Sequence, residues 1–151
     1  IVVSVQIFLF IVIWLYKMDD HKEGSNSAII SLLVIYALVV ILVCGFTLKV
    51  TVNDPTDKIV YLERRCRQTG EPFSQKDYGF YCEACETHVS AFAKHCSTCN
   101  RCVADFDHHC QWTNNCIGSS NYRAFMAMLT SVFLKFVIQL ATSAEVLTTL
   151  I

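Results

Sequence analysis

The pattern of hydrophobic and polar positions divides the chain into three apolar blocks separated by two polar segments. The middle block, residues 28–48, contains 21 consecutive positions without a charged side chain. Because about 20 apolar residues suffice for a helix to cross roughly 30 Å of hydrocarbon, this block predicts a transmembrane helix. The first block, residues 1–16, is equally apolar but shorter, and we expect it to belong to a truncated first transmembrane helix. Residues 17–27 are rich in turn formers and predict a short non-cytosolic loop between antiparallel helices.

The last block, residues 124–151, predicts a third transmembrane helix that is truncated at its C-terminal end. Asn121 suits the N-cap position of this helix, because an Asn side chain accepts a hydrogen bond from a free amide of the first turn. Lys135 is the charged residue in the middle of the block. We expect its ammonium group to pair inside a helix bundle or to reach the membrane surface rather than to take part in transport.

The polar segment between the second and third blocks, residues 49–123, contains nine of the twelve basic residues. Basic residues near the ends of membrane spans favour the cytosolic side, and Lys49, Lys58 and Arg123 occupy such positions. The cysteines are concentrated in this segment, and cytosolic thiols remain reduced and available for metal binding or catalysis. We therefore expect the segment to lie in the cytosol. The net charge of −1 argues against nucleic acid as a partner.

The first part of this segment, residues 49–81, is interpreted as a cytosolic juxtamembrane linker. Residues 54–57 have the composition of a turn. The residues that follow, 58–68, leave two alternatives open: a short amphipathic helix along the membrane surface, or an ordinary solvated linker. No internal repeat is found at the period of a solenoid protein.

The second part, residues 82–123, is dense in potential metal ligands. Seven cysteines and four histidines lie between Cys82 and Cys116. A Cys-x2-Cys turn places two thiolates at two corners of a tetrahedron, and further Cys and His residues complete it, which is the pattern of a zinc site. Disulfides are a poor alternative, because an odd number of cysteines in a reducing compartment would leave one thiol unpaired.

A count of the ligands leaves a surplus. Two tetrahedral sites need eight ligands, which six cysteines and two histidines supply, so that one cysteine and two histidines remain. Cys110 is the natural surplus thiol, because a histidine and a carboxylate beside it would activate a metal-free thiol as a nucleophile. Asp107 would fix the tautomer of that histidine while its other ring nitrogen faces the thiol. The count leaves open which histidines bind metal.

The spacing Cys-x2-Cys-x9-His-Cys-x2-Cys-x2-Cys-x4-Asp-His-His-Cys-x5-Cys, followed by Asn121, Tyr122 and Phe125, closely resembles the cysteine-rich domain of the DHHC family of protein S-palmitoyltransferases. The resemblance implies an α-helical polytopic membrane protein, here a fragment with three transmembrane helices. A small cytosolic cysteine-rich double-zinc domain would lie between helices 2 and 3. The implied location is an endomembrane, in the Golgi or ER, or the plasma membrane.

The resemblance also implies roles for individual residues. Cys110 would be the nucleophile, with His108 as its base and Asp107 orienting that base. Trp112 would contact the acyl chain, and Lys94 would contact the phosphates of coenzyme A. Two structural zinc ions would be bound, one by Cys82, Cys85, His95 and Cys102 and the other by Cys96, Cys99, His109 and Cys116.

The chain departs from the family pattern at three places. Gln111 follows the reactive cysteine, where the family usually has proline. Thr56 stands where an Asp-Pro-Gly motif normally has glycine, so this turn is expected to differ in backbone shape. Lys94 is the basic residue left before the His-Cys pair, in a region where basic or proline residues are frequent.

The implied function is that of an enzyme, a protein S-palmitoyltransferase. It would move a palmitoyl group from acyl-CoA to Cys110 and then to cysteine thiols of substrate proteins, at the cytosolic face of the bilayer and with ping-pong kinetics. The alternative is a non-catalytic membrane-tethered scaffold that binds zinc and partner proteins. The intact Asp107, His108 and Cys110 favour the enzyme.

Four further residues receive structural interpretations. Cys44 is expected to be a small buried side chain in the second helix. Cys66 is interpreted as a free juxtamembrane thiol, with its own lipidation as the alternative. His88 falls outside the ligand spacing and is expected in a surface loop. Phe125 is expected to pack among the helices.

Overall fold

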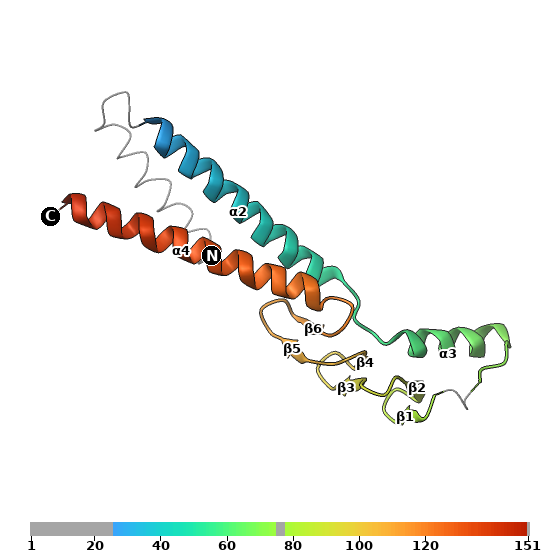
Figure 1. Ribbon diagram of the computed structural model, residues 1–151. Helices are drawn as coiled ribbons and strands as arrows, with labels where there is room; N and C mark the ends of the chain where they lie inside the picture. Colours follow the sequence, from blue (N-terminus) through green and yellow to red (C-terminus); the bar gives the residue numbers. More distant parts are fainter. Residues whose placement is uncertain (1–25, 75–77, 151) are drawn as a thin grey trace. The chain divides into compact units, whose positions relative to one another are not determined.

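The computed structural model describes residues 26–74 and 78–150, which form three helices and six short strands (Figure 1). The helix predicted over residues 1–16 lies outside the described residues, as does nearly all of the loop predicted over residues 17–27. The chain divides into two compact units, and each is described by itself. One unit is Ile1–Cys44 with Met128–Ile151, and the other is Gly45–Ala127.

Two long helices account for the described apolar blocks. Helix α2 is Asn26–Val52 and helix α4 is Tyr122–Leu150. Their segments Ile30–Val52 and Tyr122–Ala144 are each long and apolar enough to cross a membrane. The predictions of helices over residues 28–48 and from residue 124 onward are therefore confirmed, although both helices extend beyond the predicted bounds.

In the unit that contains most of both long helices, packing is limited to a narrow contact. Tyr36 is buried, and its hydroxyl donates a hydrogen bond to Gln139 Oε1 at 3.0 Å. Lys135 is also buried, with its ammonium 5.3 Å from the centroid of the Phe136 ring, consistent with the expectation that it lies within the helix packing. Cys44 is exposed, so its prediction as a buried side chain is wrong.

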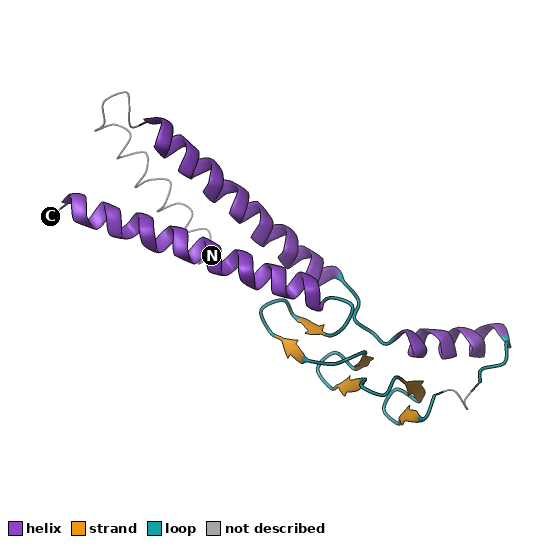
Figure 2. Cartoon of the chain, in the orientation of Figure 1, coloured by secondary structure: helices purple, strands orange, loops and turns teal. Residues whose placement is uncertain are grey.

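The unit Gly45–Ala127 contains three two-stranded antiparallel hairpins (Figure 2). The turn of each hairpin ends in a residue with left-handed backbone, at Glu86, Asn100 and Asn114, where φ is 52°, 49° and 47°. Such a residue lets a two-stranded ribbon reverse within a few positions, and Asn tolerates this conformation well. The hairpins are β1 (Phe80–Cys82) with β2 (Thr87–Val89), β3 (Lys94–Cys96) with β4 (Arg101–Val103), and β5 (His108–Cys110) with β6 (Asn115–Ile117).

The three hairpins form a repeat of 14 residues. Cys82, Cys96 and Cys110 end the first strand of successive hairpins at this interval. The three left-handed residues and the strand registers keep the same interval, with Thr87, Arg101 and Asn115 paired opposite the three cysteines. A search at solenoid periods misses this repeat because turn and ligand positions define it, rather than a periodic apolar face.

Helix α3, Lys58–Thr69, packs on the first hairpin. The carboxylate of Asp57 caps its first turn by accepting a hydrogen bond from the amide of Ile59 at 3.0 Å. Gly70, with φ of 75°, ends the helix and donates its amide to the carbonyl of Cys66 at 2.9 Å. Of the two alternatives for residues 58–68, the helix is confirmed. Its location along a membrane surface stays a prediction.

The buried face of α3 is held by a charged residue. Glu63 is almost fully buried, and its carboxylate accepts hydrogen bonds from the amide of His88 at 2.5 Å and from Arg67 Nη2 at 2.7 Å. Burial alone would raise the pKa of Glu63, but these hydrogen bonds outweigh it and hold the pKa below its ordinary value. His88 lies in strand β2 rather than in a loop. Cys66 is buried on the same helix, which removes the exposure that lipidation requires.

Asp57 joins three parts of this unit. One carboxylate oxygen caps α3, the other accepts the amide of Ser90 at 2.7 Å, and the Asp57 amide donates to the carbonyl of Cys102 at 2.9 Å. The side chain is 2% exposed, so its loss would leave buried amide groups without partners. Asp57 therefore links the helix to the first two hairpins.

We predict that Asp57→Ala destabilises α3 against the hairpins by about 1–3 kcal/mol, because a helix cap and a buried charged hydrogen bond are lost together. Amide hydrogen exchange of the full protein in detergent should show exchange in Lys58–Thr69 that is faster by roughly 5- to 150-fold. Glu71→Ala removes an exposed carboxylate just beyond the helix and is the matched control. Unchanged exchange in the Asp57 variant would contradict the assignment.

Candidate metal centres and reactive cysteine

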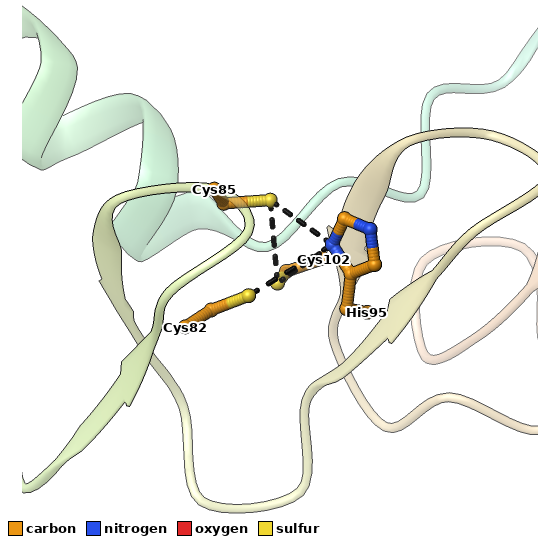
Figure 3. Close-up of side chains that lie close together, drawn as sticks. All are labelled: Cys82, Cys85, His95 and Cys102. Carbon is orange, nitrogen blue, oxygen red and sulfur yellow. Dashed lines mark hydrogen bonds between the residues drawn. The ribbon is translucent and has the colours of Figure 1, made fainter.

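The first candidate metal centre joins hairpins β1–β2 and β3–β4 (Figure 3). The imidazole of His95 presents Nδ1 to three sulfur atoms, at 3.8 Å from Cys82, 3.3 Å from Cys85 and 3.9 Å from Cys102. The Sγ atoms of Cys85 and Cys102 lie 3.6 Å apart. All four ligand atoms lie within 4.8 Å of one another, as the corners of one tetrahedron would.

The second candidate centre repeats this arrangement 14 residues further along the chain. Nδ1 of His109 lies 3.8 Å from Cys96 Sγ, 3.2 Å from Cys99 Sγ and 3.6 Å from Cys116 Sγ. The Sγ atoms of Cys99 and Cys116 are 3.3 Å apart. Each centre therefore takes two cysteines from one hairpin and a histidine and a cysteine from the next, and ties successive hairpins together.

The chemistry of the two groups fits zinc. Three sulfurs and one imidazole nitrogen are a donor set that Zn²⁺ binds in closed, structural tetrahedral sites. Burial, followed by contacts with neighbouring thiols, raises the pKa of Cys102 and of Cys116 above the ordinary value. Three thiols this close together lose all their protons only when a cation compensates the charge. The two groups are thus compatible with two zinc ions.

Two buried donors beside the groups support this fit. Thr87 Oγ1 and Arg101 Nε are buried and have no hydrogen-bond partner within the described residues. Thr87 is paired opposite Cys82 and Arg101 opposite Cys96, so each stands beside the first ligand of one group. Three thiolates around a divalent zinc ion leave a charge of −1, and a nearby hydrogen-bond donor stabilises such a centre.

Strand alternation decides which histidine faces metal. Successive residues of a strand point to opposite faces, so His109 and its partner Cys116 share one face of the third hairpin while His108 and Cys110 share the other. His109 and Cys116 both belong to the second Cys3His group, and Cys110 belongs to neither group. The geometry supplies an answer that the ligand count had left open.

Cys110 lies in an apolar setting at the end of β5. It is 5% exposed and packs with Val50, Ile117 and Ala124, against which Phe125 also packs. These contacts lie near the end of α2 and the start of α4, within the unit Gly45–Ala127. The thiol is therefore held by hydrophobic packing rather than by a metal group.

Two further candidate residues lie next to Cys110 in sequence. His108 Nδ1 is 3.5 Å from Asp107 Oδ2, an ion-pair distance, and both side chains are about half exposed. The ring of Phe125 meets that of His108 edge to face, with centroids 5.3 Å apart. Phe125 packs as predicted, and its contact with His108 is not evident from the sequence pattern.

Asn115 is the residue paired opposite Cys110, and its role exceeds what the sequence indicated. Its amide group donates to the main-chain carbonyls of Val50 at 2.8 Å and Asn53 at 2.7 Å. Its carbonyl accepts from Arg101 Nη2 at 2.7 Å and from the Cys116 amide at 2.9 Å. Asn115 thereby fastens the third hairpin to the C-terminal end of α2 and satisfies carbonyls that a helix end leaves free.

Asn121 occupies the position before α4, where its main-chain carbonyl accepts the Phe125 amide at 2.9 Å. Its side chain turns away from the helix, accepting the Gly118 amide at 2.9 Å and donating to the Cys116 carbonyl at 2.8 Å. The expected side-chain cap is thus replaced by bonds to the turn that follows β6. A glycine is required in that turn, because a Cβ at Gly118 would lie 2.5 Å from the Ala104 carbonyl oxygen.

The two residues expected to contact the acyl-CoA both lie on the surface. Trp112, in the turn between β5 and β6, is 95% exposed. Lys94, the first residue of β3, is exposed as well. Their exposure leaves both available to a ligand, and the contacts with acyl chain and coenzyme A stay predictions.

Comparison with known proteins agrees with this geometry. No curated protein matches the chain. The family model for the DHHC palmitoyltransferase matches residues 75–151, just over half of the chain, and covers both Cys3His groups and the Asp-His-His-Cys run. The family is membrane-bound, in accord with the two candidate membrane-spanning helices. The chain therefore belongs to the DHHC palmitoyltransferase family.

Proposed function

We propose that this protein is a protein S-acyltransferase that carries a long-chain acyl group, palmitoyl, on Cys110. The acyl group would come from acyl-CoA and pass to cysteine thiols of substrate proteins at the cytosolic face of the membrane. The observation that carries the proposal is the position of Cys110. It lies outside both Cys3His groups, on the strand face that also carries His108, with Asp107 beside that histidine.

The side chains support a two-step transfer. Asp107 pairs with Nδ1 of His108, which leaves Nε2 of the ring free to take the proton of the Cys110 thiol. The thiolate then attacks the thioester carbonyl of acyl-CoA, a new carbon–sulfur bond forms at Cys110, and coenzyme A leaves as a thiolate that receives the proton. In the second step a substrate thiol gives its proton to His108, attacks the Cys110 thioester and takes the acyl group.

The setting of the thiol suits a lipid donor. A palmitoyl chain gains about 0.8 kcal/mol for each methylene buried in hydrocarbon, so its thioester is held where the bilayer meets water. Cys110 packs on Val50 and Ala124, close to the end of one candidate span and the start of the other. A nucleophile at the ends of two membrane helices lies at the depth where that thioester is found.

The metal centres would have a structural part in this function. Both sites have four protein donors, so zinc would hold the hairpins together and leave no open position for a substrate. The residues of this chain that would bind it are the three cysteines and one histidine of each group. A surface hollow of about 460 Å³ opens beside Asp107 and is lined also by Phe106, Tyr122 and Arg123. It offers a substrate protein access to this side of the hairpin.

We predict that Cys110→Ser in the complete protein abolishes labelling by palmitoyl-CoA that is sensitive to hydroxylamine, because no other side chain of the site forms the thioester. Zinc content should stay at two ions per chain. Cys44→Ser removes an exposed thiol outside the site and should label normally. Persistent labelling of the Cys110 variant would exclude its role as acyl carrier. It would favour the alternative of a non-catalytic zinc-binding scaffold.

The two neighbouring histidines should differ when each is replaced by alanine. His109→Ala, like His95→Ala, should lose about one zinc ion, because a ligand of a closed site is missing. His108→Ala should keep both ions and slow self-acylation by roughly 10²- to 10⁴-fold, the usual contribution of a general base. Metal analysis of the three purified variants checks the assignment. Equal zinc loss in all three would show that His108 is a ligand.

A further inference from the structure

The third hairpin follows the plan of the two metal-binding hairpins. In each of the first two, a cysteine at the end of the first strand and a second cysteine three positions later begin one metal group. The corresponding residues of the third hairpin are Cys110 and Thr113. The left-handed turn residue that follows, Asn114, matches Glu86 and Asn100 at the same interval.

Each hairpin also closes the group that the preceding hairpin begins. His95 and Cys102 of the second hairpin close the first group, and His109 and Cys116 of the third close the second. One repeat further on, the corresponding positions are Arg123 and Thr130. Both lie in helix α4, and neither residue type supplies a zinc ligand. Of the four ligand positions of a third group, Cys110 alone carries a metal-binding side chain.

Other interactions replace the missing metal in the third hairpin. Cys110 and Ile117 pack against Val50 and Ala124, and Asn115 is bonded to the end of α2. Thr113 is 3% exposed, and its Oγ1 lies 3.5 Å from the main-chain oxygen of Cys110. The hairpin therefore keeps the metal-binding backbone while its stability comes from packing and hydrogen bonds.

We propose that Cys110 occupies the first-ligand position of an incomplete third metal hairpin, and that Thr113 is the positioning residue that keeps its thiol out of metal coordination. A zinc-bound thiolate is stabilised and much less reactive than a free one. A second sulfur at position 113 would complete the Cys-x2-Cys turn that binds metal in the other two hairpins. This inference rests on the proposed function of Cys110, but its test reads metal binding and not acyl transfer.

The test exchanges the residue that distinguishes the hairpins. Thr113→Cys in the full protein, loaded with two zinc ions, is titrated with Cd²⁺, and bound metal and cadmium–thiolate absorbance are measured. We expect a third metal equivalent, with loss of Cys110 labelling by a thiol reagent in its presence. Thr113→Ser keeps the hydroxyl and should bind no third ion. Asn114→Cys places the added thiol one position out of register and should bind none either.

A second exchange covers the case in which the Thr113 variant fails to fold. Cys99→Thr gives the second hairpin the residue of the third, and should lose about one zinc ion and make Cys96 reactive toward the thiol reagent. Absence of a third metal in folded Thr113→Cys, an equal gain in Asn114→Cys, or retention of both ions by Cys99→Thr would each overturn the proposal. A wild-type protein without transferase activity that still gives the expected metal results would contradict the proposed function alone.

Discussion

The alternation of side chains along one short strand is the constraint on which the site depends. In β5, His109 points toward the second Cys3His group, and the residues on either side of it point the other way. Two adjacent histidines in the sequence thus acquire different surroundings within one strand. The same alternation separates Cys110 from the sulfur atoms that a zinc ion would bind. A shift of register by one residue would exchange the two faces and place the thiol on the metal side.

The repeat of 14 residues shows how such a site is built from common parts. The first two hairpins are tied by ligands that each shares with its neighbour, which suits a region with little apolar core. The third hairpin has neighbours of another kind, the ends of α2 and α4, and can be held by Val50, Ala124 and the hydrogen bonds of Asn115. Because those contacts supply the stability, the hairpin can leave one cysteine free. The Arg101–Asn115 hydrogen bond also connects this tie to the hairpin of the second metal group.

Much of this organisation could be predicted from the sequence. The apolar blocks of residues 28–48 and 124–151 predicted the two described helices, because about 20 apolar residues in a row leave few other structures. Cysteine and histidine spacing predicted the residues that gather into two groups, since ligand chemistry restricts the side chains that take part. The turn residues Asp57 and Gly70 bound a helix that the sequence had left as one of two alternatives.

Other features depend on long-range contacts that no local pattern reveals. Glu63 and His88 are 25 residues apart and meet only when α3 packs on β2, so the burial of Cys66 and the strand position of His88 were missed. Asn115 looks like an ordinary polar turn residue until its carbonyl partners in α2, more than 60 positions away, are known. Cys44 was expected to be buried on grounds of residue type, yet it lies on an exposed part of its helix. By contrast, the Cys-x2-Cys and Cys-x2-Thr turns at one interval were a signal that could have been found.

The most direct test of the central claim is X-ray absorption at the zinc edge of the complete protein, compared with its Cys110→Ser variant. If Cys110 lies outside the metal coordination, both proteins should show an average of three sulfur and one nitrogen ligands per zinc and give the same spectrum. A fall in the average number of sulfur ligands in the variant would show that this thiolate binds zinc, and would contradict the assignment of Cys110 as the metal-free nucleophile.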